Sequence, residues 1–136
     1  MPIMEWDNSL DVGVTAMNDE HKQILDAMNR IFDATQAGGT GDEINRLVER
    51  LGAVCVRHFA DEENYMASIG FPGQRNHKLI HEDLLDRYGK YAAQIKAAGG
   101  RADQGFFHFL RHWLQSHIKG IDVKYSGHAS PGSRAA

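Results

Sequence analysis

The chain has 136 residues, 42% of them hydrophobic, and a formal net charge of -3 with histidine neutral. This length suits a single domain with a buried core, and the mild acidity without a basic cluster argues against nucleic acid as a partner. No apolar run is long enough to span a membrane. A single cysteine excludes an intramolecular disulfide, and the first residues do not resemble a signal peptide, so we expect a cytoplasmic protein.

The N-terminal third of the chain predicts an arm followed by a helix. Residues 1–18 lack helical periodicity, and we expect them to form an extended arm that lies on the rest of the domain. The polar cluster at residues 18–20 is typical of a helix start, and the glycine pair at 38–39 predicts where this first helix ends. Thr40, followed three residues later by Glu43, has the form of a capping box and predicts the start of a second helix.

The rest of the chain predicts two further helices. The second helix should end in the Gly-Phe-Pro-Gly segment at 70–73, the third should cover about 74–98, and the fourth should begin near Asp103. Four amphipathic helices with short connections predict an all-α fold, an up-down-up-down antiparallel four-helix bundle over residues 1–125. Residues 126–136 are mostly small and polar, and we expect a flexible tail.

Polar side chains fall on the apolar face of every predicted helix. Residues four positions apart differ by only about 40° around a helix, so such pairs share one face. A single histidine on such a face is usually a hydrogen-bonded core residue. Burying five histidines and a glutamate without a common partner would cost several kcal/mol, which a metal site in the bundle core would avoid. The six residues, in helix order, are His21, His58 with Glu62, His77 with His81, and His117.

The types of donor indicate which metal this site would hold. The lone Cys55 disfavours an iron–sulfur cluster or a thiolate zinc site. Five histidines are also more than one tetrahedral zinc ion needs. A mixed imidazole and carboxylate set of this size suits two iron ions bridged by carboxylates.

This arrangement resembles the hemerythrin family, in particular its single-domain bacterial members. The family pattern is one histidine on the first helix, His-x-x-x-Glu on the second, His-x-x-x-His on the third and His-x-x-x-x-Asp on the fourth. The resemblance covers about residues 3–125 and includes Trp6 in the arm. The chain fills the pattern with His21, then His58 and Glu62, then His77 and His81, then His117 and Asp122.

The resemblance implies a non-haem centre of two iron ions joined by an oxo or hydroxo bridge. By the family pattern, His77, His81 and His117 would bind one iron, His21 and His58 the other, and Glu62 and Asp122 would bridge them. Two six-coordinate irons would then keep one open position, on the iron with two histidines, where dioxygen would bind. We expect a dry, apolar pocket there. Its candidate wall residues, for which ordinary core packing is the alternative, are Leu114 first, then Leu25, Val54 and Trp113.

The fourth-helix motif requires an irregular helix. Asp122 follows His117 by five residues, which is about 140° away on a regular helix and would aim the two side chains apart. We therefore predict either that the helix ends near Gly120 or that it contains a wide turn of the π type.

The remaining histidines, the cysteine and a second glutamate are expected to lie outside the site. Glu63 should point to one side of the centre. His108 and His112 should lie on the outer surface of the fourth helix, with a secondary surface metal site as the alternative. Cys55 is expected to be a buried, inert thiol, and His128 in the tail to have no structural role.

The predicted function is reversible dioxygen binding, for storage, transport or delivery to an oxygen-consuming enzyme, by a protein that is not itself an enzyme. The main alternative is a sensor of oxygen, redox state or nitric oxide that uses the same di-iron site. An oxidase or peroxide-consuming enzyme is a further alternative, disfavoured because no histidine follows a glutamate by three residues as in glutamate-rich di-iron enzymes. The last alternative is a bundle in which the metal has a purely structural role. Without a large apolar outer face, we expect a monomer.

Overall fold

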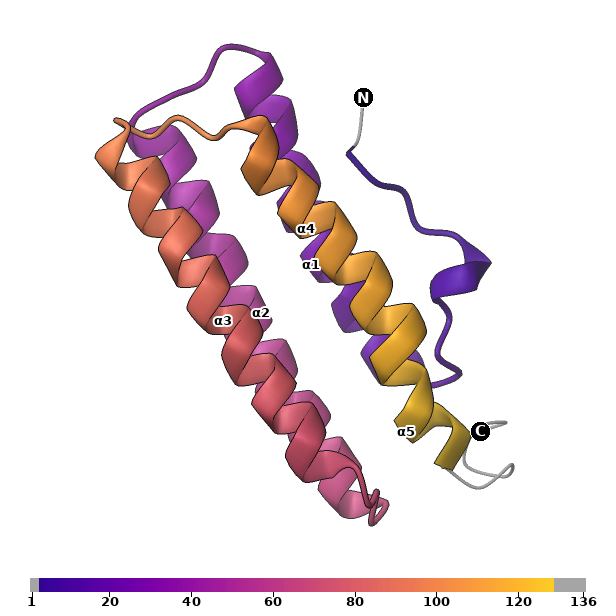
Figure 1. Cartoon of the computed structure of the whole chain (residues 1–136). Helices are drawn as coiled ribbons and strands as arrows, with labels where there is room; N and C mark the ends of the chain where they lie inside the picture. The colour runs from indigo at the N-terminus through magenta and orange to yellow at the C-terminus, as the bar shows by residue number, and fades with distance from the viewer. Residues whose placement is uncertain (1–2, 129–136) are drawn as a thin grey trace.

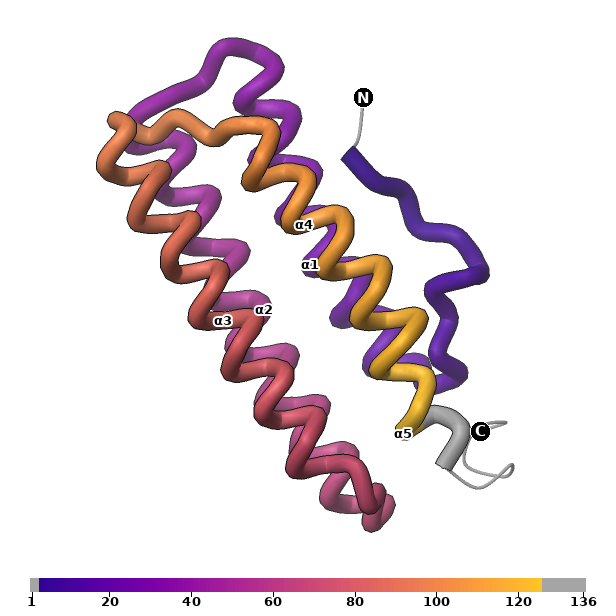
Figure 2. Tube along the Cα trace, in the orientation of Figure 1, coloured from indigo at the N-terminus to yellow at the C-terminus, as the bar shows by residue number. Residues whose placement is uncertain are grey.

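The computed structural model describes residues 3–128, and within that range it is built of helices with no strand (Figure 1). The predicted four-helix bundle is confirmed. Figure 2 shows the four long helices running alongside one another, with the α1–α2 and α3–α4 loops at the same end of the molecule. In chain order the elements are the 3-10 helix η1 (Asn8–Leu10), α1 (Thr15–Gln36), α2 (Asp42–Ser68), α3 (Gln74–Ala97), α4 (Gln104–His117), the π-helix η2 (Ile118–Asp122) and α5 (Val123–His128).

The N-terminal arm is tied to α1 by side-chain hydrogen bonds. Asn29 accepts from the backbone N–H of Ile3 at 2.9 Å and donates to the carbonyl of Met4 at 2.9 Å. Asn18 does not cap α1 as predicted, because the helix already begins at Thr15. Its side chain accepts from the N–H of Val12 at 3.0 Å instead, and so fixes the arm where it enters the helix.

The N-cap of α2 lies one residue beyond the predicted one. Gly41, not Thr40, is the N-cap residue, with a φ of 71° that glycine adopts more easily than other residues. The Gly41 N–H donates to the carbonyl of Gly99 at 2.9 Å, which joins the two loops at this end of the bundle. A Cβ on Gly100 would lie 2.3 Å from the Gly41 carbonyl oxygen, so this approach requires glycine.

The chain beyond α4 stays helical further than predicted. α5 continues to His128, three residues past the predicted domain end at 125. Residues 129–136 of the predicted tail, and the side chain of His128, lie outside the described part of the structure. None of the described helices combines the length and hydrophobicity that a membrane span needs.

The core is formed by apolar faces from all four long helices. Aromatic rings join helices that are distant in sequence: Phe32 of α1 meets Phe107 of α4 at 5.1 Å, and Tyr91 of α3 stacks on Phe109 of α4 at 4.7 Å. Each long helix therefore presents one face to the bundle axis, and polar residues placed on that face converge.

Candidate metal centre

Seven polar side chains converge in the bundle interior, and all seven were predicted from the sequence. Each is at most 6% exposed. They come from every long helix and from η2, so the site spans the whole bundle cross-section. They are His21 on α1, His58 and Glu62 on α2, His77 and His81 on α3, His117 on α4 and Asp122 on η2.

The predicted wide turn after α4 is confirmed. Residues Ile118–Asp122 form a π-helix, and Asp122 at its end is fully buried. A π turn takes up one more residue than an α turn, so a residue five positions after His117 returns to the same face. The irregular turn is therefore what allows Asp122 to point into the site.

Glu62 lies between two groups of histidines and gives one oxygen to each. Its Oε1 is 2.9 Å from Nε2 of His81 and 3.1 Å from Nε2 of His77. Its Oε2 is 3.3 Å from Nε2 of His58 and 3.6 Å from Nε2 of His21. The two oxygens of one carboxylate thus serve α3 on one side and α1 and α2 on the other.

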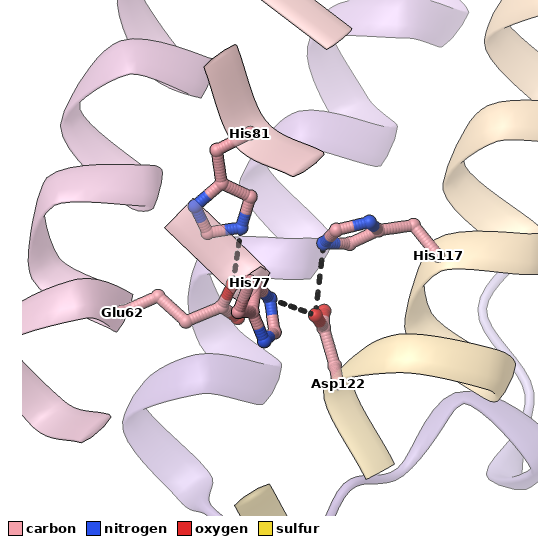
Figure 3. Close-up of side chains that lie close together, drawn as sticks. All are labelled: Glu62, His77, His81, His117 and Asp122. Carbon is pink, nitrogen blue, oxygen red and sulfur yellow. Dashed lines mark ion pairs between the residues drawn. The ribbon is translucent and has the colours of Figure 1, made fainter. Parts of the chain in front are cut away.

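Asp122 divides its oxygens in the same way. Its Oδ1 is 2.9 Å from Nε2 of His117 and 3.0 Å from Nε2 of His77, contacts that Figure 3 shows as dashed lines. Its Oδ2 is 2.9 Å from Nε2 of His21. The described residues therefore form two donor groups that overlap in the two carboxylates. One group is Glu62, His77, His81, His117 and Asp122, and the other is His21, His58, Glu62 and Asp122.

Many of these buried polar atoms have no hydrogen-bond partner among the residues that the structure describes. The set comprises Nε2 of all five histidines, Oε1 of Glu62 and both carboxylate oxygens of Asp122. Unpaired buried polar atoms are rare because each one is costly. Within each donor group, the imidazole nitrogens and carboxylate oxygens lie within 4.8 Å of one another. Donor atoms placed this close together fit a bound metal ion, which would supply the missing partner.

Two further carboxylates contact Nδ1, the ring nitrogen on the side away from the centre, in two of the histidines. Nδ1 of His58 lies 2.7 Å from Oε1 of Glu20, and Nδ1 of His81 lies 2.9 Å from Oε2 of Glu63. A carboxylate in this position fixes the ring and leaves Nε2 free to face a metal. Glu63 lies to the side of the centre, as predicted. The contacts of Glu20 and Glu63 with His58 and His81 were not predicted. Each glutamate directly adjoins a predicted site residue in sequence, which is the signal that could have found them.

Two aromatic side chains complete the surroundings. The Tyr125 hydroxyl donates to Oε2 of Glu62 at 2.9 Å, and the Phe59 ring stacks on His81 at 3.9 Å with an interplanar angle of 8°. Tyr125 was not predicted, because it was placed at the edge of the expected tail. Together with the core residues around them, these rings shield the site from water.

Without metal, the histidines and carboxylates of the cluster each stabilise the charged form of the other. Burial lowers the pKa of His58, but the Glu20 and Glu62 carboxylates outweigh it and raise that pKa to about 10. His77 behaves alike: burial opposes its charged form, yet Asp122 and Glu62 raise its pKa to about 9. Burial alone would raise the pKa of Glu62, and the surrounding histidines hold it well below its usual range.

The four candidates for the pocket wall lie in two environments. Leu25 and Leu114 are buried in the core. Trp113 is also buried and lines a small apolar cavity of about 10 Å³ with Phe59. Val54 is half-buried and lines a surface cavity of about 70 Å³ beside His58.

The residues predicted to lie outside the site do so where the structure describes them. His108 and His112 are exposed on α4. Cys55 is buried, and burial raises the pKa of its thiol to about 12, so it stays protonated and unreactive.

Comparison with known proteins agrees with this geometry. The family model for the hemerythrin HHE cation binding domain matches residues 12–128. Myohemerythrin from Sipunculus nudus is 33% identical over 122 residues, which cover 90% of each chain. Bacteriohemerythrin from Pseudomonas aeruginosa is 31% identical over 125 residues, covering 92% of this chain and 80% of that one. A crystal structure of wild-type hemerythrin superposes with a TM-score of 0.82 at 30% identity, covering 91% of this chain and 95% of the other.

Proposed function

The chain belongs to the hemerythrin family, and we propose that it binds dioxygen reversibly at a centre of two non-haem iron ions, for storage, transport or delivery to an oxygen-consuming enzyme. The family implies a non-haem iron site with dioxygen as its ligand. Hemerythrins are oxygen-binding proteins, so the chain is not an enzyme.

The division of both carboxylates between two histidine groups carries the proposal. A site for one metal would need both carboxylates to face a single point. Here Oε1 of Glu62 faces His81 while Oε2 faces His58, and the oxygens of Asp122 are divided in the same sense. Two carboxylates that each offer one oxygen to each side would suit the role of bridging ligands in a two-metal centre.

The two donor groups support a ligand assignment. His77, His81 and His117 would hold one iron, and His21 and His58 the other, with Glu62 and Asp122 between them. When bound, the iron pair would supply an open coordination position for dioxygen and the electrons that reversible binding requires. The side with two histidines has fewer protein donors, so the open position would lie there.

The protein around the irons has to keep the site rigid and dry. Glu20 holds the His58 ring and Glu63 holds the His81 ring, each through Nδ1. Leu114 is buried one helical turn before His117, and we assign it to the pocket wall, with Leu25 from α1 as a second wall residue. Apolar walls keep water, and the protons it carries, away from bound dioxygen.

We expect the protein to act as a monomer. The large apolar side chains exposed among the described residues, Val56, Leu79 and Val123, lie on three different helices. Scattered exposed apolar residues are normal on a monomer and do not by themselves form an interface.

The direct test counts iron and dioxygen. The full chain is loaded with iron, freed of unbound metal and reduced without oxygen, and its iron content and dioxygen uptake per chain are measured. We expect two irons and one dioxygen that is released under vacuum. Glu62→Gln, which replaces a bridging oxygen with an amide nitrogen, should lower both counts. A single iron per chain, or two irons that take up no dioxygen, would contradict the proposal.

A further inference from the structure

The outer face of α4 carries a stripe of donor side chains that the metal centre does not use. Its members repeat at helical spacing along one face, and all are exposed. Two are histidines four residues apart, and two are glutamines. The stripe is Gln104, His108, His112 and Gln115.

The two histidines of this stripe have the same four-residue spacing as His77 and His81 of the centre, although those two rings are T-shaped, with an interplanar angle of 66°. The rings of His108 and His112 are nearly parallel, with an interplanar angle of 4° and centroids 6.4 Å apart. In the centre, the ring centroids of His77 and His81 are 4.5 Å apart. Both outer rings are exposed, so side-chain rotation is free to close this difference around an ion.

The surface at this stripe is hollowed. A cavity of about 190 Å³ is lined by His108, His112, Gln115 and Arg111. The side-chain oxygen of Gln115, three residues after His112, is available as a third donor. Arg111 also lines the cavity, and its positive charge opposes a bound cation.

From this geometry we infer that His108 and His112 form a second, surface metal site that binds one divalent transition-metal ion with a preference for imidazole. Two imidazoles suit Cu²⁺, Ni²⁺ and Zn²⁺, and Cu²⁺ binds such donors most tightly of the three. The described residues that line this cavity include no carboxylate, which disfavours Mg²⁺ and Ca²⁺. The inference does not depend on the proposed oxygen binding, because no residue of this site belongs to the centre.

The test uses the iron-loaded full chain and Cu²⁺ as the probe. Equilibrium dialysis measures copper bound per chain, and iron is counted before and after. We expect one Cu²⁺ per chain with the iron count unchanged. H108Q and H112Q should each weaken copper binding at least ten-fold, and R111A should tighten it several-fold.

The double variant H112Q/Q115H is the matched control. It keeps the number of histidines and the same helix face, but it separates the two rings by seven residues, about 10.5 Å along the axis, too far for one ion to bridge. It should lose binding as H112Q does. Wild-type affinity in this variant, no copper bound by the wild type, or copper that replaces iron would each overturn the inference.

Discussion

The hydroxyl of Tyr125 donates a hydrogen bond to Oε2 of Glu62 over 2.9 Å, and both side chains are fully buried. Burial raises the pKa of Tyr125, and the Glu62 charge raises it further, so the phenol remains a donor. This bond links the last helix to the carboxylate at the middle of the centre.

Removing that hydroxyl should destabilise the protein. A hydrogen bond to a charged group contributes about 1.5–3 kcal/mol, so we expect Tyr125→Phe to lower the free energy of unfolding by about 2 kcal/mol. Urea unfolding of the metal-free protein measures this. Tyr91→Phe, at a half-buried ring that stacks on Phe109, is the matched control. Equal losses in the two variants would show that the bond to Glu62 has no special weight.

Glu20 and Glu63 should matter for metal retention although neither lies among the metal-facing residues. Loss of such a carboxylate behind a ligating histidine lowers metal affinity by about 10–100-fold. We expect Glu20→Gln and Glu63→Gln each to show this loss in competition with an iron chelator. Glu49→Gln, at an exposed position of α2, should retain wild-type affinity. Iron affinity that is the same in all three variants would refute the role assigned to Glu20 and Glu63.

Leu114 and Leu110 offer a matched pair for the pocket wall. Both are buried on α4, and truncating either to alanine should cost about 2–5 kcal/mol of stability. Only Leu114→Ala should also speed the irreversible oxidation of the oxygenated protein, because it lies one turn from His117 and would admit water. The decay of the oxygenated absorption band measures this. The assignment of Leu114 to the wall fails if the two variants decay at the same rate.

The metal-free protein should lose stability in alkaline solution. The pKa of His58 is raised from 6.5 to about 10, so its charged form stabilises the fold fully below pH 6.5, and this contribution disappears as the pH rises through about 10. The difference in unfolding free energy between the wild type and His58→Gln should therefore be large at pH 6 and small above pH 10. A difference that grows with pH would contradict the assignment of charge to this residue.

Six of the seven residues of the centre were predictable because each lies on the apolar face of its own helix. The seventh, Asp122, was predicted from the resemblance to the hemerythrin family. His58 and Glu62, for example, share a face wherever α2 packs. Once the resemblance had placed Asp122 in the site, either a helix end near Gly120 or a π turn was predictable, since His117 and Asp122 do not face one site on a regular helix. Such directions are set within a single helix, so they do not depend on how the helices pack against one another.

Contacts between helices could not be predicted in the same way. Glu20 reaches His58 across 38 residues, and Tyr125 reaches Glu62 across 63. Such contacts depend on the rotation and offset of packed helices, which spacing within one helix does not determine. The start of α1 was misplaced for a related reason: Asn18, read as a cap, serves a tertiary contact with the arm.

The central claim is tested most directly by one cycle of oxygenation followed in the visible spectrum. The iron-loaded protein is reduced without oxygen, exposed to air and then returned to an oxygen-free atmosphere, and a spectrum is recorded at each stage. Reversible dioxygen binding predicts an absorption band that appears with air, disappears when oxygen is removed and returns at full height in a second cycle. A single, one-way change to an oxidised spectrum would contradict reversible binding by this centre.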